Sequence, residues 1–107
     1  MKPIERHIAM GNDMLAKSKN NGDTWQVMGE RYIKTAELAR EFCDKFFDGR
    51  YDRKQWLREH AEAVDMKKLR KLVTDELKMR IANPKYWFKV KMELFGAFTV
   101  FGRKGTA

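Results

Sequence analysis

The chain is poor in cysteine and proline and has no long apolar run. Cys43 is the only cysteine, so the chain cannot form an internal disulfide, and no Cys/His spacing suits zinc. Lys89, Lys91 and Glu93 interrupt the most apolar segment, which leaves no stretch of roughly 18 uncharged apolar residues that would span a membrane. These absences favour a protein of a reducing compartment, and we expect it in the cytoplasm.

Recognisable catalytic patterns are also missing. The two histidines, His7 and His60, have no serine or cysteine nucleophile paired with them by a known motif. The segment 44–52, DKFFDGRYD, lacks the alternating acidic ligands of a calcium loop, and no glycine-rich loop precedes a helix to hold phosphate. We therefore expect a non-enzymatic protein with no catalytic residue, no cofactor and no metal site.

Helix signals occur along the whole chain, whose 107 residues are enough for one core. Pro3 suits a first helical position, and the motifs DTWQ and DRKQ each place Asp three residues before Gln, as in a capping box. Apolar residues then recur at helical steps in four segments, near 3–19, 24–48, 52–65 and 65–82. With a fifth helix at the C-terminus, we expect an all-α, compact bundle of about five helices that forms a single helical domain over 1–107.

The segment 24–48 is predicted to be the central helix, because its apolar residues form one continuous arc. Small residues follow the middle of that arc and allow another helix to approach closely: Gly29, Ala36, Ala39 and Cys43. The residues that we expect to be buried are Trp25, Tyr32, Cys43 and Phe46. Val27 and Leu38 lie on the polar side, which favours a contact with another protein.

Residues 83–105 fit two structures. Alternating apolar and charged residues fit a β-hairpin at 86–102, but its tight turn would place bulky Phe95 at positive φ. As a helix, Asn83 is the cap, Pro84 is the first residue, and Lys91 lies on the apolar arc, where its ammonium group must reach solvent or a carboxylate. The apolar positions of this helix recur at three- and four-residue steps: Trp87, Val90, Leu94, Phe98 and Phe101. Start signal and periodicity favour the helix, with the hairpin as the alternative.

Two short motifs resemble parts of known families. The spacing Trp-x2-Met-Gly-x2-Tyr in WQVMGERY resembles the first helix of a tetratricopeptide repeat, but the second helix of that repeat is not matched, so the motif indicates a close helix contact at Gly29. The segment 57–77 resembles a helix-turn-helix up to Asp65, where glycine is usual. Lys71 and Thr74 then occupy positions that are apolar in a recognition helix. A winged version of that motif would need the hairpin.

The charge is unevenly distributed. The formal net charge is +8, and residues 66–104 hold eleven Lys and Arg against three acidic residues, so the rest of the chain is neutral in sum. Within this segment Lys67, Lys71, Thr74 and Lys78 follow one line down the predicted helix 65–82. The predicted residues for binding a nucleic acid or an acidic partner are Lys67, Lys68, Lys71, Thr74, Lys78, Lys85, Lys89, Arg103 and Lys104.

Two functions fit these features. The first is a small effector or inhibitor that docks through aromatic side chains on a larger protein involved in nucleic-acid transactions. The alternative is a DNA- or RNA-binding protein of low sequence specificity that uses the basic helix 65–82 and the C-terminal basic residues, because lysines hold phosphates without reading bases. Binding to a membrane surface through the last helix is the third function, and a solvated basic face without a partner is the alternative interpretation of the lysine stripe.

Overall fold

The structure is a computed structural model that describes residues 1–102, without the side chains of Asn21 and of residues 100–102. Five helices follow one another along the chain: α1 (Pro3–Asn21), α2 (Asp23–Lys45), α3 (Arg53–His60), α4 (Met66–Arg80) and α5 (Pro84–Gly102). No strand occurs among the described residues, so the all-α prediction is confirmed and the alternative hairpin at 86–102 is wrong. The helix wins there because Asn83 Oδ1 accepts from the amides of Lys85 and Tyr86, which fixes the first turn of α5.

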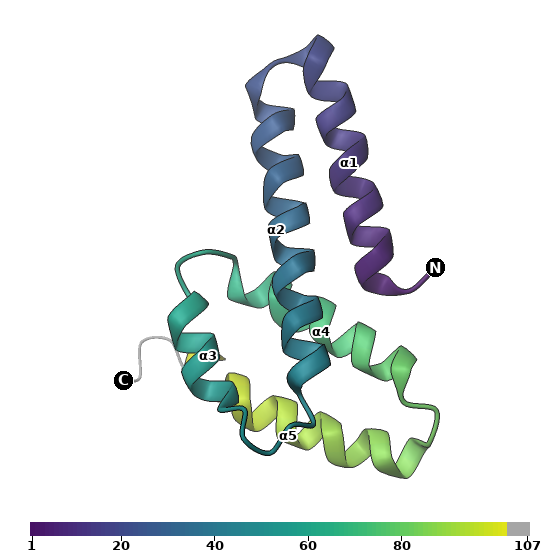
Figure 1. Cartoon of the computed structure of the whole chain (residues 1–107), viewed down its shortest axis with the longest axis vertical. Helices are drawn as coiled ribbons and strands as arrows, with labels where there is room; N and C mark the ends of the chain where they lie inside the picture. The colour runs from purple at the N-terminus through teal and green to yellow at the C-terminus, as the bar shows by residue number, and fades with distance from the viewer. Residues whose placement is uncertain (103–107) are drawn as a thin grey trace.

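The helices form two parts around α2. Helices α1 and α2 are antiparallel and make a long arm, while α3, α4 and α5 surround the lower half of α2 (Figure 1). The radius of gyration is 15.1 Å, against about 13 Å expected for a compact chain of this length. The projecting arm accounts for the difference.

The arm is held by a close approach of two helices at glycine. A Cβ atom placed on Gly29 would lie 2.8 Å from the carbonyl oxygen of Gly11 and 2.9 Å from Cγ of Leu15. Both glycines are buried, and each leaves room for the backbone of the other helix. The close contact predicted at Gly29 is therefore confirmed, and Gly11 is the partner that the sequence did not reveal.

The core lies where the lower half of α2 meets the other helices. The ring of Phe42 lies between 5.4 and 6.1 Å, centroid to centroid, from four other aromatic rings: Phe46, Tyr51, Trp56 and Phe98. Fully buried aliphatic side chains from the other four helices complete it: Ile4, Leu57, Leu69, Val73, Leu77 and Val90. Cys43 and Phe46 are buried as predicted.

Burial differs from the prediction at three positions of α2. Trp25 and Tyr32 are only half-buried: Lys17 of α1 lies over the Trp25 ring, and the Tyr32 ring stacks on His7 of α1 at the edge of an open hollow. Leu38, expected on the polar side, is buried at 6% exposure. The lower half of α2 has helices on more than one side (Figure 1), so its buried arc is wider than one predicted from a single apolar face.

The starts predicted for α1, α3 and α4 are confirmed, as is that of α5, whereas the cap predicted at Asp23 is wrong. Asp52 and Asp65 accept from backbone amides at the first turns of α3 and α4, and the second of these caps marks the predicted break. Asp23 is not a cap, because Gly22, at a φ of 88°, joins α1 directly to α2 and makes Asp23 the first helical residue. Gln26 and Gln55 do not reach back as a capping box requires; each donates to a glutamate one turn ahead.

Helix α2 ends at Lys45, three residues earlier than predicted. The carbonyl of Phe46 accepts from the Arg53 guanidinium at 2.7 and 3.2 Å. The amide of Arg50, which would continue the helix by donating to Phe46, instead donates to Asp48 Oδ1 at 2.9 Å. Side chains thus take both groups of a hydrogen bond that a helix continued through Gly49 would need, and the chain turns into α3.

Candidate binding surface on helices α4 and α5

Helix α4 separates an apolar side from a charged one. Its buried apolar residues face the core: Leu69, Leu72, Val73 and Leu77. The opposite side carries Lys67, Lys71 and Lys78, all exposed, at the four- and seven-residue spacings that keep side chains on one line. The predicted lysine stripe is therefore exposed on α4.

Three of the predicted residues meet α5 in a groove of about 590 Å³: Lys67, Lys71 and Thr74. The same groove is lined by residues that the sequence analysis did not select: Arg70 and Asp75 from α4, and Lys91, Met92, Leu94 and Phe95 from α5. Four cationic side chains thus share one groove with a single carboxylate. The apolar residues that line it, Met92, Leu94 and Phe95, all come from α5.

The charged groups of the groove are only weakly neutralised. Lys71 Nζ lies 3.1 Å from Asp75 Oδ2, an exposed pair of the kind that contributes little to stability. The Arg70 guanidinium lies 5.6 Å from the centroid of the Phe95 ring, within cation–π range. The hydroxyl of Thr74 donates a hydrogen bond to the Arg70 carbonyl oxygen at 2.7 Å, so this donor is already used within the helix. The cations are the groups left to bind a partner.

Helix α5 carries a row of exposed apolar side chains, which we call the apolar row: Phe88, Met92 and Phe95. They are 62%, 57% and 57% exposed, and their spacing of four and three residues puts them on one face. Val90, Leu94 and Phe98 are buried on the other face, at 1 to 3% exposure. This row was not predicted from the sequence, because one apolar arc was enough to predict the helix. The four- and three-residue spacing of Phe88, Met92 and Phe95 was the signal for a second apolar face.

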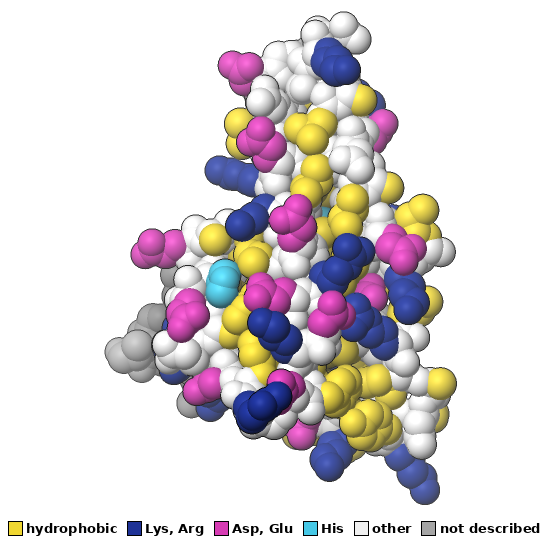
Figure 2. Space-filling view, in the orientation of Figure 1, with side chains coloured by type: hydrophobic (Ala, Val, Ile, Leu, Met, Phe, Trp, Pro, Cys, Tyr) yellow, Lys and Arg dark blue, Asp and Glu magenta, His cyan; other side chains and the backbone are white. Residues whose placement is uncertain are grey.

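A second exposed apolar group adjoins the start of α5. The rings of Phe47 and Tyr86 are stacked at 5.9 Å with 21° between their planes, and they are 51% and 45% exposed. Figure 2 shows hydrophobic side chains gathered over this end of the molecule, with Lys and Arg side chains beside them. Exposed apolar area of this kind marks interaction surfaces in soluble proteins.

The remaining predicted residues lie apart from the groove. Lys68 lines a different pocket, beside His7. Lys78, Lys85 and Lys89 are exposed but do not line the groove. Lys91, which does line the groove, reaches solvent as expected, with Nζ 5.8 Å from the Phe88 ring centroid. Two further predicted binding residues lie outside the described residues: Arg103 and Lys104.

Two groups that often take part in catalysis, Cys43 and His60, are engaged in the fold. Cys43 is 1% exposed, and burial, with smaller contributions from Glu76 and Asp44, raises the pKa of its thiol to about 12 although Arg80 opposes the shift. A ring nitrogen of His60 lies 2.8 Å from the Trp56 carbonyl oxygen. Residues 1–102 contain no group of three or more metal-ligating side chains. No helix in that part of the chain is long and apolar enough to cross a membrane.

The comparisons add no relative to this geometry. No family model, no curated protein and no solved structure matches the chain.

Proposed function

We propose that the chain is a small non-enzymatic binding protein that docks on a larger protein through α5, as an effector or inhibitor of that protein. The observation that carries this proposal is the apolar row, because Phe88, Met92 and Phe95 are all more than half exposed and no other described element covers them. Leaving three large apolar side chains in water is unfavourable, and burial in a partner removes that cost.

The composition and spacing of the row suit a protein partner. Apolar anchors at positions i, i+4 and i+7 of a helix are the pattern by which a helix fills a groove on another protein. Aromatic residues and methionine are enriched at protein interfaces, whereas a row centred on Met92 offers no continuous stacking surface to bases. The row is flanked by three exposed lysines, Lys85, Lys89 and Lys91. We therefore expect acidic groups at the edge of the partner's binding surface.

Two further predictions accompany this proposal. A basic rim suits a partner whose own surface is acidic, and we still predict that this partner takes part in nucleic-acid transactions. We also propose the cytoplasm as the location, where the single thiol of Cys43 would stay reduced.

A second candidate function is low-specificity binding of DNA or RNA along the groove between α4 and α5. The observation that favours it is the convergence of Lys67, Arg70, Lys71 and Lys91 beside Phe95. Cations that follow a backbone next to an aromatic ring are the usual parts of a surface for single-stranded nucleic acid.

The test uses one variant for each surface. Phe88 belongs to the apolar row but does not line the groove, whereas Arg70 lines the groove and is not part of the row. Phe88→Ser and Arg70→Gln are each used, next to the unaltered chain, to capture partners from lysate with and without nuclease. Both residues are exposed, so both variants should keep the helical circular dichroism of the parent.

If the chain docks on a protein, the captured protein partners should remain after nuclease treatment. Phe88→Ser should then weaken their binding about tenfold or more, and Arg70→Gln should weaken it less. Capture of nucleic acid alone, weakened by Arg70→Gln and unaffected by Phe88→Ser, would overturn the proposal in favour of the second candidate.

A further inference from the structure

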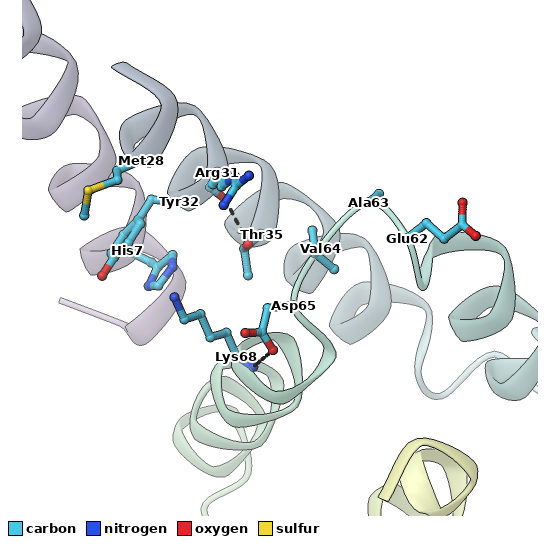
Figure 3. A pocket seen from close by; sticks show the side chains of 10 residues that line it. All are labelled: His7, Met28, Arg31, Tyr32, Thr35, Glu62, Ala63, Val64, Asp65 and Lys68. Atoms are coloured by element: carbon cyan, nitrogen blue, oxygen red, sulfur yellow. Dashed lines mark hydrogen bonds between the residues drawn. The ribbon is translucent and has the colours of Figure 1, made fainter. Parts of the chain in front are cut away.

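A second hollow lies on the other side of α4, between the arm and the α3–α4 connection. It has a volume of about 380 Å³, within the range of small-molecule sites. Figure 3 shows that side chains from α1, α2 and α4 converge on it, with the Lys68 side chain extending from α4 toward His7 of α1. Thr35 of α2 borders the same space. Lys68 therefore lines this hollow, whereas its neighbour Lys67 lines the groove between α4 and α5.

The hollow holds cations and hydrogen-bond donors that the protein itself does not neutralise. Arg31 and Lys68 line it, and among the described residues neither side chain forms an ion pair with a carboxylate. The hydroxyl of Tyr32 and the ring nitrogens of His7 make no hydrogen bond within the described part of the chain. Four groups that can donate to an anion thus border one space.

The two carboxylates nearby do not satisfy these donors. Asp65 Oδ1 accepts from the backbone amides of Lys67 and Lys68 at 2.9 and 3.4 Å, so it caps α4 and occupies the positive end of that helix. Glu62 lies on the far side of the pocket from Lys68 (Figure 3). The end of the hollow between Arg31, His7 and Lys68 is the part that lacks negative charge.

The His7 ring is held in place and kept neutral. It stacks on Tyr32 with ring centroids 4.3 Å apart and 9° between the planes. Burial first, and then the charge of Lys68, lower the pKa of His7 below its ordinary value. By contrast His60 has a ring nitrogen 2.8 Å from the Trp56 carbonyl oxygen, and it lies outside this hollow. A ring nitrogen of His60 is thus already engaged within the fold, whereas both ring nitrogens of His7 remain able to bind a ligand.

We infer that this hollow is a binding site for a small organic anion, which places a carboxylate or phosphate group among Arg31, Lys68 and His7 and its apolar body against Met28 and Val64. Charge-assisted hydrogen bonds to an anion are stronger than those between neutral groups, and the guanidinium of Arg31 can offer two at once. Met28 and Val64 supply the apolar lining that such pockets combine with a few polar groups. The inference is independent of docking through α5, since no residue of α5 lines this site.

Binding should depend on pH through His7. The charged groups around it are Arg31 of α2, Lys68 and Asp65 of α4, and Glu62 of the connection, and a bound anion would offset the two cations. An anion therefore raises the pKa of His7, so affinity rises as pH falls from 8 toward 5.5. Each unit by which the pKa rises on binding corresponds to at most about a tenfold gain in affinity. A carboxylate probe is suited to this series because it stays ionised over that range.

The experiment follows the resonances of the two histidine rings by NMR during titration with benzoate, phenyl phosphate and the neutral phenol. We expect saturable shifts of His7 with benzoate or phenyl phosphate, none with phenol, and no response of His60. The tighter of the two anions tells whether the site prefers carboxylate or phosphate. Lys68→Gln should weaken binding about tenfold, whereas Lys67→Gln, an equal change of charge one residue away, should leave it unchanged.

Non-saturating shifts, equal shifts with phenol, or equal weakening by Lys67→Gln and Lys68→Gln would overturn the inference, because each would show a general response to salt or to an apolar solute. If the affinity for benzoate does not rise as pH falls from 8 to 5.5, His7 does not contact the bound anion. Loss of protein capture by Phe88→Ser tests the α5 surface alone, so the two proposals fail separately.

Discussion

The backbone amide of Ile4 donates to Glu76 Oε1 at 3.0 Å, across 72 positions of sequence. Helix α1 has no side-chain cap of its own, because Lys2 precedes it, and the buried carboxylate of α4 takes over that role at the positive end of the helix. The other oxygen, Oε2, accepts from Arg80 Nε at 3.0 Å, and Arg80 Nη1 reaches Asp44 Oδ1 at 2.8 Å. One chain of hydrogen bonds thus joins α1, α4 and α2.

This network gives the first stability prediction. Glu76 is 2% exposed, so removing its carboxylate leaves the Ile4 amide without its acceptor and takes one of the two partners from Arg80. Burial lowers the pKa of Arg80, but its hydrogen bonds to Asp44 and Glu76 outweigh that effect, so the guanidinium stays charged. We expect Glu76→Ala to lower the free energy of unfolding by about 2 to 4 kcal/mol.

Urea denaturation measures this change, and Glu76→Gln is the matched control. The amide oxygen of Gln can still accept from Ile4, so the loss should be smaller than with Ala. Equal losses for the two variants would assign the effect to the charge and not to the cap.

Two glycines should respond to alanine in opposite directions. A Cβ on Gly29 meets the Gly11 carbonyl at 2.8 Å, so α1 and α2 must move apart, and Gly29→Ala should destabilise by about 1 to 3 kcal/mol. Gly96 lies exposed in α5 with nothing within 4 Å of the new methyl group. Gly96→Ala should therefore stabilise by several tenths of a kcal/mol to about 1 kcal/mol, because alanine favours helix. Thermal melts of both variants test the pair, and a lowered melting temperature for Gly96→Ala would contradict the helical conformation of this segment.

The buried thiol predicts loss of stability at alkaline pH. Burial raises the pKa of Cys43 to about 12, so the folded state holds its proton more tightly than the unfolded chain does. Its contribution is complete below the unfolded pKa, near 9, and is lost as pH rises toward 12. Burial also raises the pKa of Tyr51, which acts in the same direction.

Melting temperatures between pH 8 and pH 11 test this dependence. The melting temperature should fall less steeply with pH in Cys43→Ala than in the parent. This difference in slope is independent of any loss of stability at pH 8 from the missing side chain. Parallel curves for the two proteins would exclude Cys43 as a cause. In the native state at pH 8, a thiol reagent should label Cys43 only at the rate of opening of the core.

The alternative nucleic-acid function makes a prediction about salt. If the α4 stripe contacts duplex phosphates, replacing Lys67, Lys71 and Lys78 by Gln should reduce the slope of log affinity against log salt by about two to three units. A matched triple on the arm, Lys2, Lys19 and Lys34 to Gln, removes the same charge elsewhere and should change the slope less. An unchanged slope in the α4 variant would place any nucleic-acid binding on another surface.

The sequence alone was enough for features that depend on near neighbours. Asp52, Asp65 and Asn83 cap helices through amides two or three residues ahead, so the residues that decide these starts are adjacent in the chain. The break before α4 and the choice of helix for α5 follow from the same local hydrogen bonds and from apolar spacing. Asp23 shows the limit even here, because the positive φ of Gly22 shifted the helix start by one residue.

Only the tertiary structure decided which faces meet and which stay open. Leu38 is buried and Phe88 exposed because burial depends on the sides from which neighbouring helices arrive, and a hydrophobic period does not specify how many there are. Lys67 and Lys68 are adjacent in sequence, yet about 100° apart around α4 they face different hollows. Glu76 likewise caps a helix 72 residues away, and contacts of that range exist only once the chain has packed.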